Sequence, residues 1–142
     1  MVTLVLGVVD VPYDDRGEST STAQVASWLE TKYNVMGTYV ELHRHDIEKS
    51  LINSMEGALE DLYAGSPIKD PYADAMQEVQ AGFRMFLMTG EIEDAGVEGV
   101  PTQAALDRKS HRFKNKVSDH ARPSFIDTST YEMSMRAWID EK

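Results

Sequence analysis

The chain has 142 residues, 42% of them hydrophobic, a formal net charge of −10 and no cysteine. This length fits a single domain over residues 1–142, and the lack of cysteine excludes disulfide bonds and thiolate metal sites. The negative charge disfavours nucleic acid as the main partner, because an acidic protein repels phosphate.

The N-terminal segment, residues 1–21, is expected to form a strand or an extended arm. Residues 2–12 are rich in Val and Leu, which favours a strand, and Pro12 ends it. The segment has no basic leading region, so we do not expect a signal peptide. No run approaches the ~20 apolar residues of a membrane span, so we expect no membrane partner.

Residues 22–90 carry the spacing of long helices and form the predicted helical body. Ser21 and Gln24 have capping-box spacing, and the apolar residues after them predict a helix over 22–36, with Gly37 as a stop or kink. A second amphipathic helix of about 25 residues is predicted to stop before Gly65. Its apolar stripe comprises Val40, Ile47, Leu51, Met55, Leu59 and Leu62.

A third helix is predicted from Asp70–Pro71, a typical start signal, to Thr89–Gly90. Its apolar face follows heptad spacing through Tyr72, Met76, Val79, Phe83 and Phe86. We therefore expect a mainly α fold. It would be a helical bundle of three long helices, with an N-terminal strand or extended arm and a short C-terminal β/helix arm.

Residues 91–123 are predicted to form a loop and a basic arm, with a short helix from Gln103 capped by Thr102. Residues 107–122 hold six basic and two acidic residues, a balance of +4, so the rest of the chain sums to −14. This imbalance favours contact between the arm and an acidic surface on a second copy. The residues expected to make that contact are Arg108, Arg112, Lys114, Lys116 and Arg122.

The basic arm also permits an alternative function. Its cations could neutralise phosphates while Phe113 stacks on a base. The protein would then be a nucleic-acid-binding accessory protein that uses residues 108–122.

Residues 124–142 are predicted to form a C-terminal docking segment. Phe125–Ile126 favours a short strand, and the capping-box spacing of Ser129 and Glu132 predicts a last helix through Trp138. A strand is the alternative, because apolar residues also alternate there. Large apolar side chains in this segment would either fill the chain's own core or dock on another subunit. The candidate interface residues are Phe125, Tyr131, Met135 and Trp138.

No motif for catalysis or cofactor binding is found. Glu41 and His45 are four residues apart, but a third metal ligand at matching spacing is absent, so we expect a solvated helix face. The chain contains no GxSxG, Walker A or GxGxxG motif. We predict no enzyme activity, no cofactor and no metal site.

The segment RPSFIDTSTYEMSMRAWI is similar to a segment of the neck and tail-completion proteins of tailed bacteriophages. Asp127, Thr128, Ser134 and residues 136–139 match the pattern of these head-to-tail connector proteins, whereas Ser129 stands where glycine is expected. The stretches VPTQAAL and VVDVPY look like parts of the same group.

The resemblance implies a virion protein that is made in the host cytoplasm. It would be a ring-forming subunit between the portal or head and the tail, with no catalytic residue. Its partners would be its own copies and other neck, portal or tail proteins. An acidic lumen would let DNA pass without specific binding.

Overall fold

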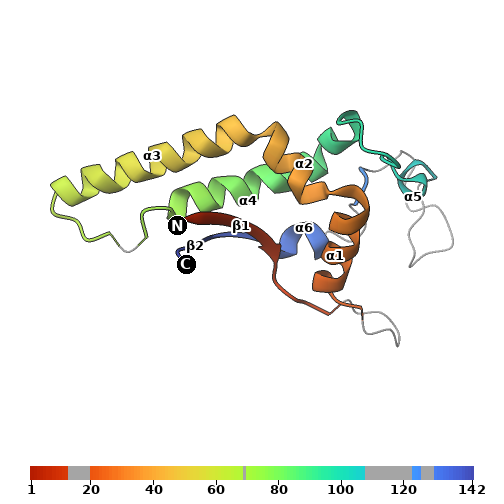
Figure 1. The fold of residues 1–142 in the computed structure, drawn as a ribbon, viewed down its shortest axis with the longest axis horizontal. Helices are drawn as coiled ribbons and strands as arrows, with labels where there is room; N and C mark the ends of the chain where they lie inside the picture. Colours follow the sequence, from red (N-terminus) through yellow and green to blue (C-terminus); the bar gives the residue numbers. More distant parts are fainter. Residues whose placement is uncertain (13–19, 69, 108–122, 126–129) are drawn as a thin grey trace.

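The computed structural model describes residues 1–12, 20–68, 70–107, 123–125 and 130–142. The fold is mainly helical, as predicted, with one small sheet (Figure 1). In chain order, its elements are β1 (Thr3–Val8), α1 (Thr22–Tyr33), α2 (Val35–Leu42), α3 (Arg44–Tyr63), α4 (Ala73–Met88), η1 (Glu91–Asp94), α5 (Gln103–Leu106), α6 (Thr130–Ser134) and β2 (Met135–Asp140).

The first predicted helix is shorter than expected, because the chain breaks at Asn34 and not at Gly37. Asn34 adopts φ of 50°, a left-handed conformation that Asn tolerates better than most residues. The carboxylate of Glu30 then accepts the amides of Met36 and Gly37 at 2.8 and 3.0 Å, which satisfies the open N-terminus of α2. Gly37 lies inside α2, where a Cβ would collide with the Asn34 side chain.

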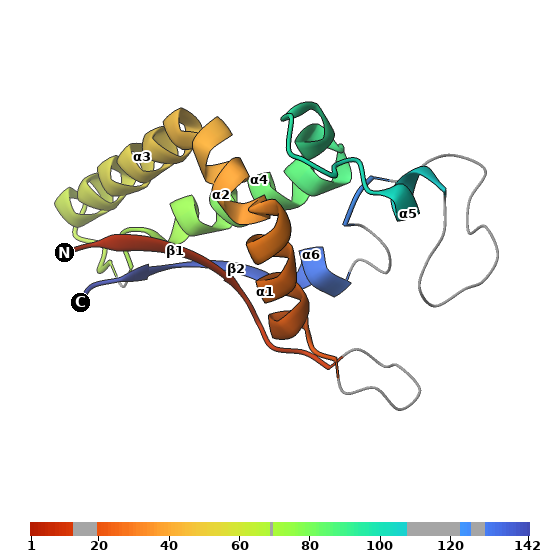
Figure 2. The same cartoon turned by 45° about the vertical axis from the view of Figure 1, so that its right-hand side comes forward.

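The second predicted helix is divided at His43 into α2 and α3. Its expected end is confirmed, because α3 stops at Tyr63 and Gly65 follows with φ of 82°. The prediction of three long helices is therefore replaced by α1, α2, α3 and α4, of which α3 and α4 pack side by side (Figure 2).

The third predicted helix is confirmed as α4, with its start moved to Ala73. Asp70 still acts in the preceding turn, where its Oδ1 accepts the amide of Tyr72 at 2.9 Å. Four residues of the predicted stripe are buried, together with Leu87. They are Met76, Val79, Phe83 and Phe86.

The two chain ends pair with each other, which the sequence did not predict. The N-terminal strand is confirmed as β1, and it forms an antiparallel ladder with β2, from Thr3 opposite Asp140 to Val8 opposite Met135. The predicted last helix holds only as far as Ser134, after which the alternative strand is the correct one. The sheet lies along α4, where Gln80 Oε1 accepts the amide of Ala137 at 3.1 Å.

The connection between α4 and α6 differs from its prediction at two points. The helix capped by Thr102 is confirmed, with Thr102 Oγ1 accepting the amide of Ala105. The predicted loop over 92–100 instead begins with the 3₁₀ turn η1. Phe125 lies in a turn with φ of 68° and not in a strand. Among the residues described, no helix is long and apolar enough to cross a bilayer.

Candidate functional site

Two of the four predicted docking residues belong to this chain's own core, which corrects the prediction for them. Tyr131 and Met135 are buried, and the Tyr131 ring meets Phe83 edge-on at 6.4 Å between centroids. The short helix α6 and the register of β2 turn both side chains toward α4. They cannot present an apolar surface to another subunit.

Phe125 is half-buried, and Trp138 is partly exposed. The Phe125 ring packs on Tyr33 at 5.1 Å between centroids. The preceding residue, Ser124, is anchored through its amide and hydroxyl to Glu93 Oε1 at 2.8 and 2.9 Å. This anchor fixes the turn that carries Phe125. Trp138 stays available as a docking group.

Five predicted electrostatic contacts lie outside the residues that the structure describes. They are Arg108, Arg112, Lys114, Lys116 and Arg122. Their proposed contact with an acidic neighbour stays a prediction.

Trp138 lies flat against β1, because Gly7 leaves room for it. A Cβ at Gly7 would come within 2.7 Å of the indole ring. Val5 stands directly opposite Trp138 in the ladder. The sheet therefore presents an aromatic surface on the side that faces away from the core.

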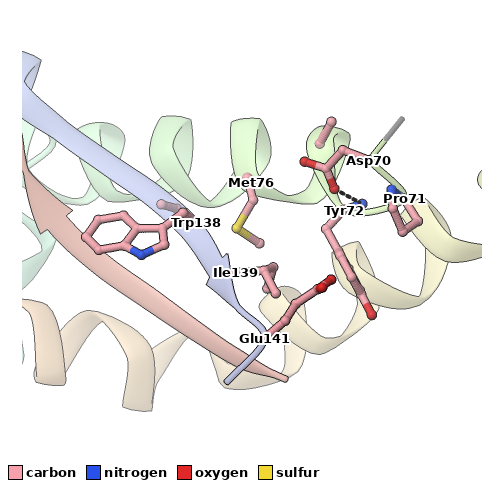
Figure 3. A pocket seen from close by; sticks show the side chains of 9 residues that line it. Asp70, Pro71, Tyr72, Met76, Trp138, Ile139 and Glu141 are labelled. Carbon is pink, nitrogen blue, oxygen red and sulfur yellow. Dashed lines mark hydrogen bonds between the residues drawn. The ribbon is translucent and has the colours of Figure 1, made fainter. Parts of the chain in front are cut away.

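Trp138 also lines a cavity of about 540 Å³ between the C-terminal end of β2 and the start of α4 (Figure 3). Met76, Trp138 and Ile139 contribute apolar groups to its lining, and carboxylates of Asp70 and Glu141 stand at the rim. The lining residues are Asp70, Pro71, Tyr72, Ala73, Met76, Ala137, Trp138, Ile139 and Glu141. Such a lining suits an apolar side chain that carries a cationic end.

A second apolar surface lies on α3, where Met55, Leu59 and Leu62 of the predicted stripe are exposed and Ile52 lies on the same face. We call Ile52, Met55, Leu59 and Leu62 the α3 stripe. Their exposed fractions are 57%, 45%, 55% and 60%. The residues are spaced by three, four and three, so they share one face of the helix.

Two serines of α3, and not the α3 stripe, make hydrogen bonds to α4 and the turn before it. Ser54 Oγ donates to the carbonyl of Pro71 at 2.8 Å, and Ser50 donates to the Glu78 carboxylate. The stripe lies on a different flank of the helix from these serines, because each residue advances about 100° around the axis. Its four large apolar side chains remain exposed on this flank.

At the α2–α3 break, His43 contacts two carboxylates, Glu91 and Asp46, and the metal site considered for Glu41 and His45 is not formed among the described residues. His43 Nε2 lies 2.9 Å from Glu91 Oε1, and its Nδ1 lies 3.5 Å from Asp46 Oδ2. Within the described part of the chain, no three His, Asp or Glu side chains could hold a metal together. His43 thus links the break between α2 and α3 to η1. The sequence did not predict this role, because the contact forms only in the tertiary structure.

Tyr39 packs beside this network. Burial, then the charges of Asp46 and Glu91, raise the pKa of its hydroxyl from 10.0 to about 12. The hydroxyl donates to the Val79 carbonyl at 3.2 Å, so it is fixed in its neutral form inside the core.

Comparisons with protein-family models, curated proteins and solved structures give no match to this chain. Any function therefore depends on the surfaces described above and on the sequence resemblance.

Proposed function

We propose that this protein is a structural subunit of the neck or upper tail of a tailed bacteriophage. It forms rings with its own copies and joins the portal or head to the tail, and it acts by binding rather than by chemistry. The observation that carries this proposal is the α3 stripe, a row of apolar side chains that its own fold leaves uncovered.

An exposed apolar side chain is ordinary by itself, but a contiguous patch is not. Single surface leucines occur on most monomers, whereas larger apolar patches mark places where another protein binds. The α3 stripe runs along successive turns, from Ile52 to Leu62. Tyr63, at 93% exposed, extends it at the helix end.

The arrangement of surfaces suits a ring. In a ring, one face of each subunit meets a different face of the next subunit. The α3 stripe and the cavity beside Trp138 are two such different faces, lined by separate residues. The cavity's carboxylates also offer a contact for cationic side chains of a neighbour.

The sequence resemblance indicates the kind of assembly to which the protein would belong. Of the matching positions, Ser134 closes α6 and residues 136–139 lie in β2, beside the cavity. Asp127 and Thr128 lie outside the described residues. The resembling segment thus forms one wall of a candidate contact surface, as expected for a subunit of a connector.

The test is a pair of variants that each add one negative charge to α3. Leu59→Glu places the charge in the α3 stripe, whereas Asn53→Glu places it on the opposite side of the same helix. Both positions are exposed, so we expect changes within about 0.5 kcal/mol in the free energy of unfolding. Light scattering coupled to size exclusion gives the mass of each variant, and electron microscopy shows whether rings form.

We expect rings from the wild type and from Asn53→Glu, and only monomers or small species from Leu59→Glu. Circular dichroism should show the same helix content in all three proteins. A wild type that stays monomeric at high concentration, or a Leu59→Glu variant that forms rings as the wild type does, contradicts the proposal.

A further inference from the structure

The outer edge of β1 is an unpaired strand edge. Val9 and Ser134 stand opposite each other, and the Val9 amide donates to the Ser134 carbonyl at 2.8 Å. In an antiparallel ladder, hydrogen-bonded pairs alternate along the strand. Residues 3, 5 and 7 therefore bond to β2, and the amides and carbonyls of Val2, Leu4 and Leu6 point to the other side.

The outer edge of β2 shows the same alternation of backbone directions, and α4 packs along that edge. The Ala137 amide points away from β1 and donates to Gln80 of α4. Among the described residues, α4 therefore packs along the β2 side at Ala137, and β1 offers the edge to which a further strand can be added. Within the described residues, the backbone groups of Val2, Leu4 and Leu6 have no hydrogen-bond partner on that side.

Nothing in the sequence protects this edge. Proteins usually blunt a free strand edge with a charged residue, a proline or a bulge. Residues 2–7, VTLVLG, contain no charge and no proline, and their ladder runs without a bulge.

The chain just past β1 is held by the start of α1. Thr22 Oγ1 at the start of α1 donates to the Val9 carbonyl at 2.6 Å and accepts the Val11 amide at 2.8 Å. The outward backbone groups of Val2, Leu4 and Leu6 precede this contact in the chain, and we call them the open edge.

We propose that this edge pairs with the same edge of a second copy, in antiparallel orientation about Leu4. Leu4 of one copy then lies opposite Leu4 of the other, and Val2 lies opposite Leu6. Each of these pairs makes two hydrogen bonds, so every open backbone group from Val2 to Leu6 gains a partner. The product is a continuous four-stranded sheet in the order β2, β1, β1, β2.

A second copy fits this edge in charge as well as in geometry. Each chain carries a net charge of −10, so most pairs of surfaces would repel. The edge from Val2 to Leu6 has no charged side chain, so no like charges of its side chains oppose each other in this contact. The contact is twofold and differs from the head-to-tail contact of a ring, so it does not rest on the proposed virion role.

Leu4→Pro and Leu4→Ala form a matched pair that tests the contact. Both remove the same side chain, which packs partly buried on the core. Only proline removes the amide of residue 4, and that amide points outward, so the ladder with β2 keeps its bonds. Sedimentation equilibrium measures the dimer dissociation constant of each, and thermal unfolding by circular dichroism verifies that both fold.

The Leu4 variants are made in Leu59→Glu, in which the α3 stripe does not assemble rings, and we expect dimers from Leu59→Glu alone and with Leu4→Ala. The dissociation constant of Leu4→Pro should be about thirtyfold higher, because the twofold contact loses two hydrogen bonds at once. Leu59→Glu, which disrupts the α3 stripe, should still dimerise through β1. Equal dimerisation of Leu4→Pro and Leu4→Ala, or a Leu59→Glu protein that remains monomeric at millimolar concentration, overturns the proposal.

Amide hydrogen exchange on the wild type tests the pairing of the two β1 strands even if Leu4→Pro does not fold. The amides of Leu4 and Leu6 should gain at least about tenfold protection between dilute and concentrated protein. The amides of Val5 and Gly7, bonded within the chain, should be protected at both concentrations. Leu4 and Leu6 amides that exchange fast at every concentration would rule out the strand pairing.

Discussion

Helices α3 and α4 carry apolar residues at the same spacing, but only α4 buries them. Phe83 and Phe86 of α4 pack against Tyr39, at 5.3 and 5.5 Å between ring centroids. The side chains of the α3 stripe are exposed, and they pack on the rest of the described chain much less than Phe83 and Phe86 do. Periodicity therefore predicts which residues share a helix face, and tertiary structure decides whether that face is covered by the same chain.

The α2–α3 break and the serine contacts explain the difference. Ile47, near the start of α3, is buried beside α2, whereas farther along Ser50 and Ser54 bring α3 close to α4 with small groups. Close approach through small residues leaves the large side chains on the flank of the helix. The exposure of the α3 stripe thus follows from the way α3 packs against α4.

The largest expected effect comes from truncating one apolar residue on each helix. Phe83→Ala empties a fully buried site and should cost about 3–5 kcal/mol in the free energy of unfolding. Leu59→Ala, on the α3 stripe, should cost less than about 1 kcal/mol in the monomer. Urea denaturation followed by circular dichroism at low concentration measures both. Similar costs for the two variants would mean that α3 is buried as deeply as α4.

Two glycines, one in α4 and one in α3, extend the comparison of these helices. A Cβ at Gly82 of α4 would come within 2.5 Å of the Tyr39 hydroxyl oxygen, whereas a Cβ at Gly57 of α3 would meet nothing within 4 Å. We expect Gly82→Ala to destabilise the fold by about 1–3 kcal/mol, because it overpacks the core. Gly57→Ala should stabilise it by up to about 1 kcal/mol, because alanine is the better helix former.

Thermal unfolding of the two glycine variants provides the measurement. The melting temperature should fall for Gly82→Ala and rise for Gly57→Ala. A melting temperature that moves in the same direction for both would show that the two helices are equally crowded.

A smaller effect is expected from the pH dependence of Tyr39. Its pKa is about 12 in the folded protein and close to 10 when unfolded. The unfolded chain therefore loses this proton first, and the free energy of unfolding should fall as pH rises from 10 to 12, by up to about 1.4 kcal/mol per pH unit. Tyr39→Phe, compared with the exposed Tyr63→Phe as a control, should remove this slope. A slope that persists in Tyr39→Phe assigns it to other groups.

Local signals in the sequence were enough to predict several elements. The heptad stripe of α4 and the Thr102 cap depend on neighbouring residues, and both are present in the fold, whereas the start predicted at Asp70–Pro71 lies at Ala73. The strand β1 was predicted for the same reason. What local patterns could not give was its partner, because β2 lies about 130 residues later in the chain.

The candidate site was predicted only in part, for a related physical reason. Tyr131 and Met135 are apolar residues near a chain end, and only the register of β2 against β1 and α4 shows that they face the core. Trp138, on the opposite face of the same strand, remains on the surface. The break at Asn34 depends on the Glu30 carboxylate, a contact that no spacing rule includes.

The central claim is that another subunit covers the α3 stripe, and oxidation of Met55 tests it most directly. Met55 lies in the stripe and is 45% exposed, while Met133 is 65% exposed on α6 and serves as the internal control. Mass spectrometry after a brief peroxide pulse measures both rates across a range of protein concentrations. The account predicts that Met55 becomes protected as the protein assembles while Met133 stays reactive. Oxidation of Met55 at an unchanged rate at every concentration would contradict it.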